Sequence, residues 1–428
     1  MPTGAGELGP VLRRATVALA CAALLPLAAC SDDLPPPTYS GGAYDDVATL
    51  IQRTLNQRSV AIERQDVARF RRTLDRGDAG LLDSEQTYFD NLGELPVGRY
   101  RLRVVEDTIT PVEGSDLDGR TEYWAEVVVA LRLDGFDAAP VRTRDRFLFV
   151  PDADGTRLLI GSTTDPGWES EHPGNAQPWD LGEVVVEQAP GVLGIFDQWT
   201  DEDASRVLDA ASSGRSDVRA VVGSDAKVAG VVVYSLQDPT FLDGLAGQTV
   251  GDPDRADGLT IAVPVDPRAP GRGVASYRIF VNPRVLGEPD VVVGRLVRHE
   301  LTHALLGSRG SGAPLWLSEG LAEYVSVRPL APGQRRLPQR ALEVGATATM
   351  LPGDAEFAGP DAEAWYAVAW WVCEYVASAY GEDVLLLLLD ELAGGADQEQ
   401  VLGRSLGLTP SQLAQRGVAL MTTTYAHG

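Results

Sequence analysis

The amino-acid sequence predicts an α+β protein whose 428 residues form two folded parts, each with its own sheet. Between residues 44 and 74, apolar residues recur every three or four positions, which is typical of amphipathic helices. Between residues 99 and 162 lie four runs typical of strands, and the alternation of apolar and polar residues is clearest in Arg99–Val104. Beyond residue 183, strands and a helix precede a long helical stretch. We therefore expect a helix-plus-antiparallel-sheet domain, then a mixed sheet with a helical C-terminal part.

Residues 1–29 have the three parts of an export signal. Arg13 and Arg14 precede an apolar run, residues 15–27, and the tetrad Leu-Ala-Ala-Cys ends at Cys30. This tetrad resembles the lipobox of bacterial lipoproteins, which implies cleavage before Cys30 and a diacylglycerol on its thiol. The mature protein would then be anchored by lipid at the extracytoplasmic face of the cell membrane. The alternative is a plain secretory signal with an incidental cysteine.

The composition limits the possible partners. The chain has 36 basic and 61 acidic residues, a net charge of −25, which argues against nucleic acid or an anionic lipid surface as a partner. Cys21 lies in the signal and Cys30 at the predicted lipidation site, so Cys373 alone remains and no disulfide framework is possible. We expect Cys373 to be buried in its apolar, aromatic helix.

A short tether and the first domain follow the signal. Residues 30–43 contain three consecutive prolines and two glycines, which indicates a semi-extended tether. The first domain, residues 44–165, is expected to have one or two helices within Asp45–Leu74 and strands at Tyr100–Val105, Tyr123–Leu133, Val141–Val150 and Arg157–Ser162. This order is similar to that of nuclear transport factor 2-like or cystatin-like domains. Because the stretch contains no histidine or cysteine, we interpret it as a binding or spacer module.

Residues 166–182 are rich in proline and glycine, which predicts a linker between the domains. His172 lies in this stretch, so we expect a solvated side chain rather than a metal ligand. The same expectation applies to His427, near the end of the chain.

The second domain, residues 183–428, is predicted to begin with strands around one helix and to continue with helices. The strands are expected at Glu183–Glu187, Gly191–Phe196, Val228–Tyr234, Leu259–Val263 and Ser276–Asn282, and the first helix at Asp201–Ser212. The later helices are expected at Asp290–Leu306, Leu315–Val327, Asp361–Tyr380 and Glu382–Leu392, and a capping box at Thr409 begins the last one. The apolar run Leu385–Leu389 is too short to cross a bilayer, so we expect it to be buried.

The helix Asp290–Leu306 carries the run His299-Glu300-Leu301-Thr302-His303. Positions i and i+4 share a helix face, so both imidazoles can reach one metal ion while Glu300 flanks the open position. A tetrahedral catalytic zinc needs a third protein ligand and leaves the fourth place to water. The run Pro314–Tyr324 downstream offers carboxylates for this role. The alternative is a pair of buried, hydrogen-bonded histidines without a metal.

His299-Glu300-x-x-His303 followed by Trp316-Leu317-x-Glu319-Gly320-x-Ala322 resembles the gluzincin metallopeptidases of the peptidase MA-like group. This resemblance implies that Glu319 is the third ligand. It also implies that Tyr366, within Ala364–Trp370, stabilises the transition state, although a packed aromatic stripe would show the same residues. By the same analogy Glu323 would accept a hydrogen bond from a zinc histidine, the alternative being a solvated glutamate.

In gluzincins the edge strand of the sheet borders the active cleft and pairs with an extended substrate. The strand Ser276–Asn282 immediately precedes the motif helix and is expected to have this position, unless it is an interior strand.

The sequence therefore predicts a lipid-anchored, zinc-dependent peptidase that acts on peptides or proteins, with Glu300 as general base. Endopeptidase activity is favoured because the gap from His303 to Glu319 is shorter than in aminopeptidase N-type enzymes, and no Gly-x-Met-x-Asn run is present. The alternative function is a non-catalytic cell-surface binding or scaffolding lipoprotein, in which a zincin fold carries a structural zinc site.

Overall fold

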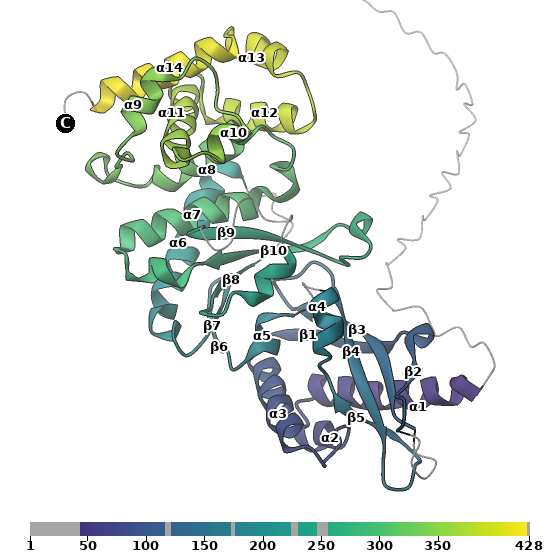
Figure 1. The fold of residues 1–428 in the computed structure, drawn as a ribbon. Helices are drawn as coiled ribbons and strands as arrows, with labels where there is room; N and C mark the ends of the chain where they lie inside the picture. The colour runs from purple at the N-terminus through teal and green to yellow at the C-terminus, as the bar shows by residue number, and fades with distance from the viewer. Residues whose placement is uncertain (1–42, 116–120, 173–175, 224–229, 246–255, 426–428) are drawn as a thin grey trace, which may run out of the picture. The chain divides into compact units, whose positions relative to one another are not determined.

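The computed structural model is a mixture of helices and strands, which confirms the predicted α+β class. The structure describes residues 43–115, 121–172, 176–223, 230–245 and 256–425 (Figure 1). The predicted signal peptide, Cys30, nearly all of the tether and His427 lie outside these residues. Two sheets organise the described chain, one in the N-terminal part (residues 43–165) and one in the C-terminal part (residues 183–425).

In the N-terminal part, helices precede an antiparallel sheet, as the sequence predicts. The helices are α1 (Ala43–Glu63), α2 (Val67–Arg71) and α3 (Ala79–Glu94). The strands are, in sheet order, β1 (Val97–Val104), β3 (Tyr123–Leu133), β4 (Val141–Pro151) and β5 (Leu158–Ser162), and the short β2 (Thr110–Pro111) pairs with β3. Side chains of α1 accept hydrogen bonds from backbone N–H groups on the outer edge of β1. Glu63, Ser59 and Gln52 accept hydrogen bonds from the backbone N–H groups of Tyr100, Leu102 and Val104.

Helix α3 is an element that the sequence patterns did not predict. Its amphipathic stripe is interrupted by Glu85 and Asn91, which are both only 3% exposed. Glu85 forms an ion pair of 2.5 Å with the buried Arg58. The side-chain amide of Asn91 donates to the carbonyl groups of Trp179 and Gly182. Because polar residues occupy core positions here, binary patterning misses the helix.

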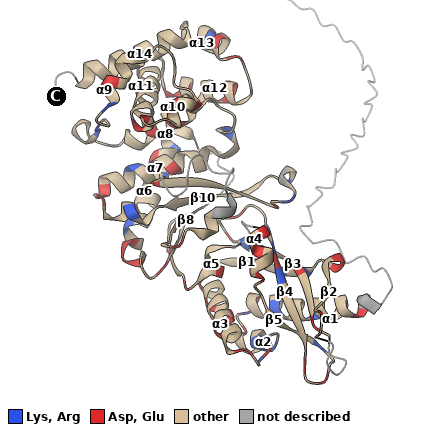
Figure 2. Ribbon diagram, in the orientation of Figure 1, with Lys and Arg blue, Asp and Glu red and all other residues tan. Residues whose placement is uncertain are grey.

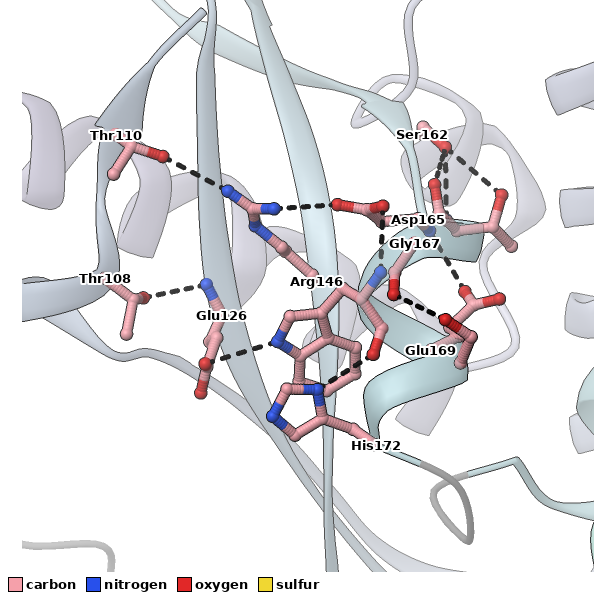
Figure 3. Close-up of polar contacts among 12 residues, drawn as sticks. Thr108, Thr110, Glu126, Arg146, Ser162, Asp165, Gly167, Glu169 and His172 are labelled. Atoms are coloured by element: carbon pink, nitrogen blue, oxygen red, sulfur yellow. Dashed lines mark hydrogen bonds and ion pairs between the residues drawn. The ribbon is translucent and has the colours of Figure 1, made fainter. Parts of the chain in front are cut away.

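The predicted linker contains two short helices, α4 (Pro166–Glu171) and α5 (Pro178–Leu181). Asp165 caps α4 through the N–H of Trp168. The expectation of a solvated His172 is wrong, because its ring is partly buried and stacks on Trp168 with 4.3 Å between ring centroids. Its Nδ1 lies 2.8 Å from the Trp168 carbonyl oxygen, and the Trp168 indole donates to Glu126 (Figure 3). These contacts fix the side chain as a packing residue.

The sheet of the C-terminal part is mixed. Its strands are, in sheet order, β6 (Val185–Ala189), β7 (Val192–Phe196), β8 (Val231–Ser235), β10 (Val274–Val281) and β9 (Gly258–Pro264). β7, β8 and β10 are parallel, whereas β6 and β9 run antiparallel at the two edges. Helices α6 (Ala204–Val222) and α7 (Asp290–Leu306) pack on one face of this sheet (Figure 1).

The expectation that Ser276–Asn282 is the edge strand is wrong, because β10 lies between β8 and β9. The residues Ile279, Phe280 and Val281 are at most 1% exposed, which is the continuous apolar run of a strand covered on both faces. The edge strand next to the motif helix is β9.

Helix α6 ends ten residues later than predicted, at Val222 instead of Ser212, and it begins at Ala204 instead of Asp201. The run Ser212-Ser213-Gly214 suggests a helix end, but Gly214 allows a close approach to α7. A Cβ at this position would lie 3.0 Å from atoms of both Arg298 and Leu301. The glycine therefore serves helix packing.

Helices form the rest of the chain. They are α8 (Leu315–Val327), α9 (Ala341–Thr347), α10 (Asp354–Phe357), α11 (Ala362–Tyr380), α12 (Glu382–Ala393), α13 (Gln398–Leu406) and α14 (Pro410–Tyr425). Cys373 is fully buried, which confirms the prediction, and the run Leu385–Leu389 is largely buried although Leu387 is exposed. Of the helices in the described residues, none has the length and apolar character to cross a membrane.

The two parts share a hydrophobic core. The second face of the C-terminal sheet, which includes Leu193, Ile195 and Phe280, packs in one cluster with residues of α1 and of the N-terminal sheet. Asp137, just after β3, forms a buried ion pair of 3.0 Å with Arg278 of β10. Elsewhere acidic and basic residues are interspersed over the helices and strands of both parts (Figure 2).

Candidate metal centre

The structure brings together His299 and His303 of α7 and Glu319 of α8. The Nε2 atoms of the two histidines are 3.2 Å apart, and each lies 3.3 Å from Oε2 of Glu319. A four-coordinate metal ion with bonds of about 2.0–2.1 Å separates neighbouring ligand atoms by about 3.3–3.4 Å. The triangle of donor atoms therefore has the dimensions of one face of such a site, and these residues are a group that can hold a metal ion.

The local sequence explains this meeting. The two histidines are one turn apart on α7, which ends at Gly307 with a φ of 53°. A Cβ at Gly307 would lie 2.9 Å from the Tyr277 ring, so both the conformation and the space require glycine there. The chain then turns and α8 begins at Leu315, which places Glu319 in the second turn of α8, opposite the histidines.

The cluster is enclosed on the side of α8 and more open at His303. The side chains of Glu319 and His299 are 7% and 12% exposed, whereas that of His303 is 23% exposed. Burial alone would lower the pKa of His299, but hydrogen bonds with Glu319 and Glu323 raise it well above its ordinary value. Burial alone would raise the pKa of Glu319, but the two histidines lower it. The carboxylates thus stabilise a positive charge at the histidines.

Glu323 extends the cluster behind His299. One of its carboxylate oxygens lies 3.3 Å from Nδ1 of His299, and the other accepts a 2.5 Å hydrogen bond from Arg295. Burial would raise the pKa of Glu323, but His299 and Arg295 lower it to about 2. A carboxylate at Nδ1 favours the tautomer whose Nε2 is free to bind a metal ion. Arg295 was missed by the sequence reasoning, although its position four residues before His299 places it on the same face of α7.

Glu300 lies beside the cluster but is not part of it. Glu300 is 6% exposed, and its Oε2 accepts a 2.8 Å hydrogen bond from Thr260 of β9. Thr260 was also missed, because no local pattern connects residues 40 positions apart in different elements.

Tyr366 of α11 lies close to the cluster. Its ring centroid is 6.4 Å from that of His299 and 5.0 Å from that of Phe357. Burial and the charges of Glu319, Glu323 and Glu300 raise the pKa of Tyr366, so it is a neutral hydrogen-bond donor at neutral pH. Unlike Trp370 on the same helix, which is fully buried, Tyr366 is only partly buried. Among the described residues its hydroxyl has no hydrogen-bond partner.

A separate cavity of about 560 Å³ lies at the carboxyl ends of β7, β8 and β10, where Trp199 and Asn282 are among its lining residues. None of the residues of the metal cluster lines it. The two sites are therefore formed by different residues.

No family model matches the chain, and a search of the curated proteins found no match.

Proposed function

We propose that this protein is a zinc-dependent peptidase of the gluzincin type, anchored by lipid at Cys30 on the extracytoplasmic face of the membrane. The observation that carries the proposal is the triangle of donor atoms from His299, His303 and Glu319, with sides of 3.2–3.3 Å. Two imidazoles and one carboxylate suit zinc, and three protein ligands leave the fourth position open, as in catalytic rather than structural zinc sites.

Zinc bound to these residues would lower the pKa of a water molecule and polarise a peptide carbonyl group. The remaining chemistry belongs to the protein. Glu300 is a carboxylate beside the ligands that binds no metal itself, so it can take the proton of the attacking water and deliver it to the leaving amine. The unpaired hydroxyl of Tyr366 can donate a hydrogen bond to the oxyanion that forms as the carbonyl carbon becomes tetrahedral.

The surrounding residues support this reaction. Glu323 and Arg295 fix the orientation of the His299 ring. The edge strand β9 pairs only with β10 among the described strands, so its outer edge can bind the backbone of an extended peptide. Such binding depends little on substrate side chains and fits an endopeptidase, the activity that the sequence favours.

Elemental analysis and a peptide-library digest, followed by mass spectrometry, test the proposal on the mature protein. Wild type should contain about one zinc ion per chain and cleave internal peptide bonds. Glu300→Gln should retain zinc and lose cleavage, because an amide cannot accept the proton. His303→Ala should lose most of its zinc.

Glu399→Gln, an exposed change on α13, is the matched control and should behave like wild type. Equal cleavage by Glu300→Gln and wild type would show that Glu300 is not the base. A wild-type protein that binds zinc and cleaves no peptide would instead support the scaffolding alternative.

A further inference from the structure

The edge strand β9 touches the side chain of Glu300 at two points. The first is Thr260, whose Oγ1 lies 2.8 Å from Oε2 of Glu300 and also 2.8 Å from its backbone oxygen. Among the described residues this is the only hydrogen bond that the Glu300 carboxylate accepts. The single hydroxyl proton is shared between the two acceptors, which ties the carboxylate to the backbone of its own helix.

The second contact is Gly258, two residues earlier on the same face of β9. A Cβ here would lie 3.1 Å from Cγ and 3.2 Å from Oε1 of Glu300, and 3.1 Å from Leu296. These distances are tighter than ordinary contacts, so a side chain at position 258 would force Glu300 to move. Glycine lets β9 approach α7 closely enough for Thr260 to reach the carboxylate.

A general base must hold its carboxylate at a fixed place relative to the proton that it takes. A free glutamate side chain has three rotatable bonds, and a misplacement of about 1 Å can cost about 100-fold in rate. In this protein the Cγ atom of Glu300 lies within 3.1 Å of the place that a Cβ at position 258 would occupy, and Thr260 donates a hydrogen bond to its Oε2. The strand therefore restricts where the other carboxylate oxygen can lie.

We infer that Thr260 is a positioning residue for the reaction, which orients the Glu300 carboxylate from the edge strand while Gly258 provides the space. The inference rests on the proposed function, since it assigns Thr260 a role in the same reaction. Thr260 acts through Glu300 and binds neither the metal nor the reacting atoms.

The test compares Thr260→Val and Thr260→Ser in the mature, zinc-loaded protein with a peptide found in the library digest. Valine keeps the branched shape and removes the hydroxyl, so kcat should fall about 10- to 100-fold while KM changes less than about twofold. Serine keeps the hydroxyl and should restore kcat to within about threefold of wild type. Zinc content should be equal in all three proteins. Thr423→Val, an exposed change on α14, is the control and should leave kcat unchanged.

A second measurement does not require activity. In the metal-free protein, the fall in Tm caused by Thr260→Val should be smaller in a Glu300→Ala background than in the wild-type background, because the two residues interact. Equal shifts in both backgrounds would show that the contact does not form.

The outcomes separate the inference from the proposed function. If the wild-type protein cleaves no peptide, the proposed function is wrong. The Tm comparison then still shows whether Thr260 and Glu300 interact. A wild type that cleaves, together with an equally active Thr260→Val, defeats the inference alone. A loss in Thr260→Val that serine does not restore, or that appears entirely in KM, would show that the hydroxyl does not position the base.

Discussion

Helices α8 and α11 cross closely at Gly320, so Gly320→Ala is expected to destabilise the protein. A Cβ at this position would lie 2.5 Å from the backbone oxygen of Ala369 and 2.9 Å from Sγ of Cys373. A carbon and a carbonyl oxygen normally approach no closer than about 3.3 Å, so the helices must separate by about 0.8 Å. The backbone oxygen cannot rotate away, and such overpacking costs about 1–3 kcal/mol. The gain in helix propensity, about 1 kcal/mol, offsets only part of this cost.

The same shift should weaken metal binding, because α8 carries Glu319, the proposed third ligand. Metal–ligand distances tolerate deviations of about 0.2 Å, so a displacement of about 0.8 Å is expected to reduce zinc affinity at least about tenfold. The assays are thermal unfolding of the metal-free protein and zinc titration against a competing chelator. The control is Gly403→Ala on α13, where a Cβ meets no atom within 4 Å and the Tm should stay level or rise. If Gly320→Ala were as stable as this control and bound zinc like wild type, the close helix crossing would be refuted.

Three further predictions concern other residues. Tyr366→Phe should bind zinc like wild type and keep a near-normal KM for the peptide substrate, but its kcat should fall about 100-fold. Tyr375→Phe on the same helix should match wild type in steady-state kinetics. The folded-state pKa of Glu323 is lowered to about 2, so its stabilising contribution is complete above its ordinary pKa of 4.5 and is lost as the pH falls toward 2. In urea unfolding of the metal-free protein, the destabilisation by Glu323→Gln should therefore shrink between about pH 5 and about pH 3, and a constant difference would reject the assignment. Cys30→Ala should leave the membrane fraction, and mass spectrometry should find diacylglycerol only on the wild-type chain.

The two histidines of the candidate metal centre were predictable because their relation is local. The spacing of His299 and His303 fixes their common face on any helix, and Arg295 follows from the same periodicity. Glu319 required a resemblance between motifs, since nothing in the local pattern distinguishes it from Glu323. Glu300 was identified by its place in the motif, but its hydrogen bond to Thr260 could not be, because that contact joins two elements across 40 residues.

The remaining differences also depend on long-range packing. The order of strands in a sheet is not encoded in any one strand, so both an edge and an interior position stayed open for β10, although its apolar run Ile279–Val281 favours the interior. Helix α3 was missed because its buried Glu85 pairs with Arg58, an arrangement that becomes favourable only when both elements are in place. Gly214 suggested the end of a helix, but this glycine allows α6 to pack closely against α7. That role depends on a distant segment and cannot be read from the local sequence.

Because they share a core, the two parts of this chain cannot be separated without a loss of stability. Separating residues 43–165 from the C-terminal part would expose the sheet face around Leu193 and Phe280 and leave Arg278 without Asp137. Removal of one partner from a buried ion pair costs about 3–5 kcal/mol, before the exposed apolar surface is counted. The N-terminal part therefore resembles a covalently attached subunit more than a detachable spacer. Substitutions at the contact are expected to be accepted only in compensating pairs, and an isolated C-terminal part should be prone to misfolding and self-association.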